Sequence, residues 1–385
     1  MADQVRTAQE LVVQAGLKLV ASGLVARTWG NISARVSDAQ FAVTPKGRAY
    51  GTLTPDDIVL LNIADCSYEG NIKPSSEKGI HASVYRLRKD INFVIHTHQL
   101  YASVLSVLGE GFDVDSQDQE LLGSFVPDAP YGISSTKKLA RNAARTIEEH
   151  PESTVILLRS HGAVCFGRTM DEAFQRADRL ERAAKKRILE LIGAPSLEQV
   201  EKMYLVKHAI NNDDVAISLG NSVRQGSGFS LRIGSEETNY LHSAIELLNS
   251  PVATLHASAY QVTKANCIIG DVTSSVLAVS RTGKTIRPYI DDVAQIIGTS
   301  IRSAASGDVI AMINKRNAVF LAKGGALCLG QDEADAKAVA MILEKECLAE
   351  ILVALTGKGK PLGRLDCWLQ RFVYLKKYSK LKNKE

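Results

Sequence analysis

Three histidines are the residues of this chain whose type and spacing could do chemistry. His96 and His98 are separated by a single residue, and His161 follows 63 residues after the second of them. Because side chains alternate between the two faces of a strand, a His-x-His pair on a strand presents both imidazoles on the same side. Catalytic zinc sites have three protein ligands and an open position, whereas structural zinc sites are closed by protein ligands. The spacing therefore predicts a catalytic divalent-metal site.

The elements that must position these histidines can be predicted from the surrounding sequence. Residues 77–89 are predicted as a helix, and residues 92–97 as a strand that runs into the histidine pair. Residues 154–166 are predicted as two strands broken at His161, and residues 169–192 as a long helix. Strands and helices alternate without the regular rhythm of a parallel crossover sheet. The predicted fold class is α/β, a three-layer α/β/α sandwich around a mixed, mainly antiparallel sheet.

Length and composition favour two ordinary globular domains. The chain has 385 residues, of which 45% are hydrophobic and 23% are charged, and its formal net charge is +4. The six cysteines include no Cys-x-x-Cys pair, which is typical of free thiols in a reducing cytoplasm. Charged residues interrupt positions 1–25, and no uncharged apolar run is long enough to span a membrane. The basic run at 376–384 is interpreted as a solvated tail. We expect a cytoplasmic protein with neither nucleic acid nor membrane as a partner.

The second half of the chain contains an altered copy of the same pattern. Residues 77–98 align without a gap on residues 237–258. This alignment keeps a glutamate and a histidine, Glu237 and His256, but it places Ser258 at the position of the second metal-site histidine. A single histidine is no metal site. The alignment therefore predicts that only the first copy binds a metal ion.

A second pair of segments supports the duplication. Residues 155–167 align on residues 318–330, and Gly324 stands at the position of the third histidine. A long helix rich in Ala, Glu and Lys follows in both copies. We therefore predict a catalytic domain at 1–210 and a degenerate domain without the metal site at 211–385.

Five short motifs of the first half occur in a characteristic order. They are Gly30-Asn31-Ile32-Ser33-Ala34-Arg35, Thr44-Pro45-Lys46-Gly47, Pro74-Ser75-Ser76-Glu77, His96-Thr97-His98 and Ser160-His161-Gly162. In this order they resemble the class II aldolase/adducin family, typified by fuculose-phosphate aldolase and ribulose-phosphate 4-epimerase. The resemblance covers about residues 5–200, and the second half resembles the family only weakly. The chain is thus identified as a tandem of one intact and one degenerate copy.

The resemblance implies a role for each motif. His96, His98 and His161 are implied to bind Zn²⁺, and Glu77 to move protons beside it. The positions that grip a substrate phosphate in relatives are Asn31, Lys46, Gly47, Ser75 and Ser76. The implied activity is that of a lyase, a class II aldolase that cleaves a carbon–carbon bond. Its substrate is implied to be a small phosphorylated ketose or keto sugar acid, cleaved through a metal-stabilised enediolate.

The resemblance leaves other functions open. A sugar-phosphate epimerase or decarboxylase would use the same enediolate and the same residues. A non-catalytic scaffold like adducin, which has lost the metal histidines, is a further alternative. Family members commonly assemble with sites between subunits, so the resemblance also implies a homo-oligomer.

Two positions depart from the family's pattern. Aldolases of the family use a tyrosine near the cleaved bond, and residues 112–123 contain none. Asp118 lies in this segment and is the candidate acid–base partner opposite Glu77. Lys46 stands where the fuculose enzyme has threonine, so it could bind phosphate, pair with a substrate carboxylate, or be a solvated turn lysine.

Overall fold

A computed structural model of the chain describes residues 2–22, 29–210, 218–241, 250–304, 309–313, 315–321 and 324–378. Contacts divide it into two compact units, unit 1 containing Met1–Ile188 and unit 2 containing Leu189–Lys376. Residues 211–217, at the predicted domain boundary, lie outside the described residues, as does most of the basic run at 376–384. The domain bounds 1–210 and 211–385 stay a prediction.

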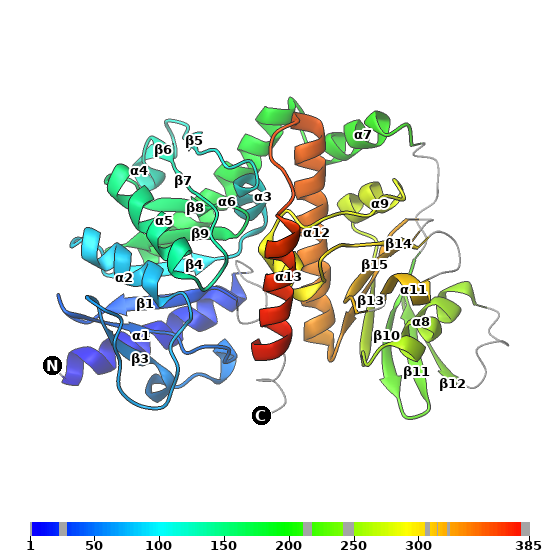
Figure 1. Ribbon diagram of the computed structural model, residues 1–385, viewed down its shortest axis with the longest axis horizontal. Helices are drawn as coiled ribbons and strands as arrows, with labels where there is room; N and C mark the ends of the chain where they lie inside the picture. Colours follow the sequence, from blue (N-terminus) through cyan, green and yellow to red (C-terminus); the bar gives the residue numbers. More distant parts are fainter. Residues whose placement is uncertain are drawn as a thin grey trace. The chain divides into compact units, whose positions relative to one another are not determined.

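Unit 1 is built around a seven-stranded sheet with the strand order β3-β2-β1-β4-β9-β8-β7 (Figure 1). Every neighbouring pair is antiparallel except the outermost pair, β7 and β8, which is parallel. The strands are β1 (Asn31–Arg35), β2 (Gln40–Val43), β3 (Val59–Asn62), β4 (Phe93–Thr97), β7 (Asp128–Ala129), β8 (Val155–Leu158) and β9 (Gly162–Gly167), with a separate pair of β5 (Phe112–Asp113) and β6 (Phe125–Val126). The predicted mixed, mainly antiparallel sheet is confirmed.

Helices cover both faces of this sheet and complete the predicted three layers. Helices α2 (Lys78–Leu87) and α5 (Lys137–Glu149) share a core with one face, formed by residues such as Val94, Val164 and Phe166. From the other face, α1 (Ala2–Ala21) packs on β1 and β2, and α3 (Leu100–Ser106) packs on β8 and β9. Gln99, just before α3, donates to the Ala177 carbonyl of α6 (Met170–Ile192). The short helix α4 (Gln119–Leu122) comes between β5 and β6 in the chain. The sequence-predicted helices at 77–89 and 169–192 are confirmed.

The central strand β4 places a polar residue, His96, in this buried core. All five of its residues, Phe93–Thr97, are buried, because β1 and β9 flank the strand and helices cover both faces. Alternation places Val94 and His96 on the face of α2 and α5. A polar ring in such a position requires buried partners, and the N-terminal end of α2 provides them.

Unit 2 repeats this topology strand by strand, which confirms the tandem duplication. Its order is β12-β11-β10-β13-β16-β15-β14, and again only the outermost pair is parallel. The strands are β10 (Asn221–Gln225), β11 (Gly228–Ile233), β12 (Glu236–Leu241), β13 (Cys267–Asp271), β14 (Ser303–Ala304), β15 (Ala318–Leu321) and β16 (Ala326–Gly330). The helices are α7 (Leu197–Lys207), α8 (Pro251–Val262), α9 (Ser274–Ser280), α10 (Asp291–Ile296), α11 (Val309–Ile313), α12 (Glu333–Thr356) and α13 (Arg364–Val373). No helix within the described ranges is long and apolar enough to cross a bilayer.

The buried histidines of α2 and α8 correct the predicted alignment of the two copies. Ser33 of β1 lies 2.6 Å from Nδ1 of His81 on α2, and Ser222 of β10 lies 2.6 Å from Nδ1 of His256 on α8. The two pairs occupy the same place in the same topology. His256 therefore matches His81, and its predicted match with His96 is wrong.

Glu237 is also not the counterpart of the metal-site glutamate. It lies on β12, the outermost strand of its sheet, where it accepts hydrogen bonds from Ser230 and Arg232. Strand β12 corresponds to β3, whereas Glu77 directly precedes α2. The two glutamates share a sequence spacing and not a position in the fold, so this part of the alignment is wrong as well.

Strand pairing identifies what replaces the histidines in unit 2. Strand β13 pairs with β16 as β4 pairs with β9, with Asp271 opposite Ala326 where unit 1 has Thr97 opposite Ala163. This register places Gly270 and Val272 at the positions of the His-x-His pair. Gly324 precedes β16 as His161 precedes β9, as the sequence predicted. Unit 2 therefore lacks all three histidines.

Candidate metal centre

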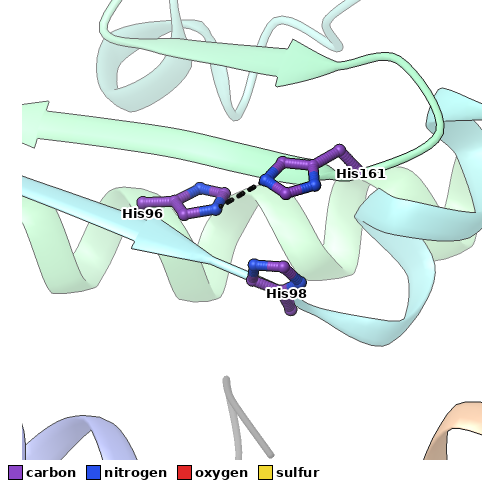
Figure 2. Close-up of side chains that lie close together, drawn as sticks. All are labelled: His96, His98 and His161. Atoms are coloured by element: carbon purple, nitrogen blue, oxygen red, sulfur yellow. Dashed lines mark hydrogen bonds between the residues drawn. The ribbon is translucent and has the colours of Figure 1, made fainter. Parts of the chain in front are cut away.

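The three predicted metal ligands converge on one point in unit 1 (Figure 2). His96 and His98 come from the end of β4, and His161 comes from the turn between β8 and β9. Their candidate ligand atoms lie within 4.8 Å of one another, and all three residues are buried. The ring centroids are 4.7 to 4.9 Å apart in every pair. The geometry therefore fits a single ion held by three imidazoles.

A tight turn aims the third imidazole at the other two. Ser160 has a left-handed backbone with φ of 58°, and the His161 amide donates to the Leu158 carbonyl at 3.0 Å. Gly162 begins β9 where that strand passes β4 closely, since a Cβ atom there would lie 2.3 Å from the Thr97 carbonyl oxygen. The Ser-His-Gly motif is thus explained by backbone geometry on both sides of the histidine.

We expect Gly162→Ala to weaken metal binding, because the added methyl must push the His161 turn away from β4. Displacing a ligand in this way should reduce zinc affinity roughly tenfold or more. Competition with a chromophoric chelator measures the affinity. The matched control is Gly325→Ala, since Gly325 directly precedes β16 of unit 2 and its Cβ would lie 2.9 Å from the Asp271 carbonyl. Equal zinc affinities for the two variants would contradict this account of the turn.

Hydrogen bonding and burial keep His96 ready to bind a metal ion. Its Nδ1 lies 2.8 Å from the carbonyl oxygen of Ala163 and must donate to it, which leaves Nε2 unprotonated in the neutral ring. Burial lowers the pKa of His96 well below its ordinary value, so the ring is neutral. Nε2 of His96 lies 3.0 Å from Nε2 of His161. Two nitrogen ligands of a tetrahedral zinc ion are expected to lie about 3.4 Å apart, so the observed distance is similar.

Glu77 faces the same point from the N-terminal end of α2. Its Oε1 lies 3.2 Å from Nε2 of His161, and its Oε2 lies 3.3 Å from Nε2 of His96. Burial alone would raise the pKa of this carboxyl, but the His161 ring that faces it lowers the pKa well below its usual value. The sequence-predicted glutamate is therefore a buried carboxylate beside the histidines.

Asn31 and the two loops with the predicted phosphate-binding residues meet beside Glu77. Asn31 lies opposite His96 in the β1–β4 ladder, and its Nδ2 donates to Glu77 at 3.0 Å. The Lys46 amide donates to the Lys73 carbonyl at 2.9 Å, which joins the 44–47 loop to the segment that enters α2. Gly47 has a φ of 73°, a backbone conformation that favours glycine.

The two predicted serines belong to the segment that enters α2. The Ser75 amide donates to the Thr44 carbonyl at 3.0 Å, and Ser75 Oγ accepts from the Glu77 amide at 3.2 Å. Ser76 Oγ accepts from Ser135 Oγ at 2.8 Å. The structure thus gathers these donors around the start of α2, next to the histidines. Phosphate binding by them stays a prediction.

Asp118 lies in a different environment. It is buried at the start of α4, and its Oδ1 accepts from Arg179 of α6 at 2.5 Å. The contacts described for Glu77 include the histidines and Asn31 but not Asp118. The acid–base role of Asp118 stays a prediction, and the arginine gives this carboxylate a structural partner.

The predicted site residues do not include His81, a buried histidine of α2 beside the site. The ring is fully buried between Ser33, which contacts Nδ1, and Asn31, whose Oδ1 contacts Nε2. The available signal was its position one helical turn after Glu77, which places both on the same face of α2.

His81 and His256 predict that the metal-free protein loses stability in mild acid. Burial lowers the pKa of each ring from 6.5 to about 4. Below about pH 6.5 the unfolded chain binds protons that the folded chain excludes, so the free energy of unfolding falls between pH 6.5 and 4. The complete effect is on the order of 3 kcal/mol for each ring. Denaturant unfolding at pH 7.5 and pH 5 measures this loss, and equal free energies would show that the folded rings accept protons.

Comparison with known proteins places this site in a family. The class II aldolase and adducin N-terminal domain matches residues 10–188. A 5-deoxy-D-ribulose 1-phosphate aldolase of Bacillus thuringiensis is 34% identical over 197 residues, 51% of this chain and 91% of the relative. The L-fuculose phosphate aldolase of Methanocaldococcus jannaschii is 33% identical over 178 residues, 46% of this chain and 92% of the relative. The chain belongs to the class II aldolase and adducin family.

A relative with a different printed activity covers the same region. A methylthioribulose-1-phosphate dehydratase of Yersinia enterocolitica is 34% identical over 164 residues, 40% of this chain and 78% of the relative. Relatives at similar sequence distance from this chain therefore include at least two reaction types.

Proposed function

We propose that unit 1 is a metal-dependent carbon–carbon lyase, an aldolase that cleaves a small phosphorylated ketose or keto sugar acid. The observation that carries the proposal is the complete site, in which three buried imidazoles and the Glu77 carboxylate face one point. Two relatives at 33% and 34% identity are aldolases of sugar phosphates. The proposed ion is Zn²⁺, because three nitrogen ligands with an open position are typical of catalytic zinc.

The residues of the site have distinct chemical tasks in this proposal. A divalent cation held by neutral imidazoles would supply Lewis-acid chemistry, stabilising the negative charge of the enediolate that carbon–carbon cleavage leaves. Glu77 is within 3.3 Å of two of the ring nitrogens, so its carboxylate borders any substrate oxygen that enters there. In the cleavage direction Glu77 would deliver a proton to the enediolate carbon, and in the reverse direction remove it.

The donors around the start of α2 are proposed to hold the substrate phosphate. Serine hydroxyls, the Asn31 amide and backbone N–H groups are short donors suited to phosphate oxygens. Lys46 on the adjoining loop would add a positive charge, which could serve a phosphate or a carboxylate of the substrate. Binding the phosphate here would place the carbonyl end of a short ketose at the histidines.

A dehydratase is the second candidate, favoured by the 34% identical methylthioribulose-1-phosphate dehydratase. Dehydration of a ketose phosphate also begins beside the carbonyl, with proton removal followed by loss of a hydroxyl group. The absence of tyrosine from residues 112–123 fits a reaction that differs from that of the fuculose enzyme. An epimerase or decarboxylase would share the same residues.

The test is incubation of zinc-loaded protein with a panel of ketose 1-phosphates and phosphorylated keto sugar acids, followed by ¹³C and ³¹P NMR. An aldehyde together with a triose phosphate supports the aldolase, whereas a dehydrated diketone supports the dehydratase. An epimer or CO₂ would assign the other two reactions. A purified protein that binds no stoichiometric divalent metal would overturn the enzyme proposal in favour of a scaffold.

Unit 2 is proposed to be a degenerate domain without chemistry of its own. Glycine or valine stands at each of the three histidine positions, Gly270, Val272 and Gly324. We propose domains at 1–210 and 211–385 in a homo-oligomer. Light scattering of the purified protein measures its oligomeric state, and a monomer would contradict the proposed homo-oligomer.

A further inference from the structure

A chain of buried hydrogen bonds runs from the core of unit 1 to the Glu77 carboxylate. Tyr85 of α2 and Ser33 of β1 are 2.8 Å apart at their hydroxyls, and Ser33 Oγ lies 2.6 Å from Nδ1 of His81. Nε2 of His81 contacts Oδ1 of Asn31, whose Nδ2 lies 3.0 Å from Glu77. Every member is less than a tenth exposed, so bulk solvent offers these polar atoms few alternative partners.

The Glu77 carboxylate and the neutral His81 ring fix the direction of every hydrogen bond in this chain. A carboxylate only accepts, so Asn31 must turn its NH₂ group to Glu77 and its carbonyl oxygen to His81. His81 must then donate from Nε2, which in a neutral ring leaves Nδ1 as an acceptor for the Ser33 hydroxyl. Ser33 in turn accepts from Tyr85. All donors therefore point toward Glu77.

Unit 2 retains the first half of this chain and lacks the second. Ser222 Oγ lies 2.9 Å from the Tyr260 hydroxyl and 2.6 Å from Nδ1 of His256. Nε2 of His256, however, lies 2.9 Å from the backbone carbonyl of Leu219. The Tyr-Ser-His part thus stabilises the fold in both units, while only in unit 1 does it reach a side chain of the site.

We propose that Ser33 and His81 are positioning residues, which fix the Asn31 amide and through it hold the Glu77 carboxylate against His96 and His161. The inference rests on the proposed function only for the expected change in kcat. Burial keeps His81 neutral, with a pKa of about 4, so its tautomer is set by its partners. Without the Ser33 hydroxyl, His81 can move its proton to Nδ1. Nε2 of His81 would then accept a hydrogen bond and would require a donor. If the Asn31 amide turned its NH₂ group to Nε2, its carbonyl oxygen would face the Glu77 carboxylate and repel it.

The test compares Ser33→Ala with Ser222→Ala, which remove the same hydroxyl from the same buried triad in the two units. Both variants should lose a similar amount of stability. Ser33→Ala should also lower kcat roughly tenfold or more, with zinc affinity changed by no more than about threefold. Ser222→Ala should leave kcat unchanged. In an Asn31→Ala background, Ser33→Ala should have no further effect on kcat, since the connection is already cut.

A spectroscopic readout separates this inference from the proposed function. In ¹H–¹⁵N correlation spectra, His81 should show the Nε2–H tautomer, and Ser33→Ala should shift both its ring nitrogens and the Asn31 side-chain amide. Those shifts are expected even if no tested sugar phosphate reacts, an outcome that would fault the proposed function alone. An Nδ1–H tautomer in the wild type, or equal kcat for the two serine variants, would overturn the inference.

Discussion

Replacing His161 with alanine is expected to lower zinc affinity on the order of a thousandfold and to abolish lyase turnover. Two imidazoles would remain, and two nitrogen ligands do not retain an ion that requires three. The alanine also leaves the Glu77 carboxylate facing a space where an imidazole nitrogen lay 3.2 Å away. Metal content after exhaustive dialysis, isothermal titration with zinc and turnover of the substrate found by NMR measure the effect.

The control for this variant is His150→Ala. His150 follows α5 on unit 1 and packs its ring against Phe125, away from the three converging imidazoles. It should keep both stoichiometric zinc and turnover. If His161→Ala also retained stoichiometric zinc, the three-histidine site would be refuted, whatever the activity of the protein.

The direction in which each of the three histidines projects could be predicted from the sequence, because the rules for it are local. A His-x-His pair on a buried strand must project to one face, and a histidine before glycine at a strand break must sit in a turn. The structure brings His96, His98 and His161 together as predicted. The helix, strand and turn that hold them also lie where the sequence placed them.

The predicted match between the two halves is wrong where it depended only on the sequence spacing of two residues and not on their positions in the fold. Glu237 and His256 repeat the separation of Glu77 and His96, yet they lie on an outer strand and on the helix α8. The hydrogen bond between His256 and Ser222, whose partners are 34 residues apart, decides the match. Such a contact follows from tertiary packing and leaves no periodic signal in the sequence.

The same reasoning explains why the hydrogen-bond chain behind Glu77 was not predicted. Its members come from β1 and α2, and the contact between Ser33 and His81 spans 48 residues. A serine in a strand and a histidine on a helix are each compatible with ordinary packing. Only their joint burial shows that each must satisfy the other, and that the last donor reaches the site.

Replacing Glu77 with glutamine is expected to reduce kcat by about 10² to 10⁴ while leaving zinc bound. The amide has nearly the same shape as the carboxylate, and the three imidazoles are untouched. It cannot carry a proton between substrate carbon and solvent, however, because an amide is not a base near neutral pH. The loss should appear in kcat with little change in KM, since the donors at the start of α2 that are proposed to bind phosphate remain.

The matched control for this last substitution is Glu237→Gln, because the sequence pairs these two glutamates and the fold separates them. Glu237 lies exposed on β12 with Arg232, so its substitution should leave kcat, KM and zinc affinity unchanged. A pH profile adds a second criterion: any limb of the kcat profile that reports the Glu77 carboxyl should vanish in Glu77→Gln and persist in Glu237→Gln. Full turnover by Glu77→Gln would mean that another group moves the proton, and Asp118 would then be the residue to replace.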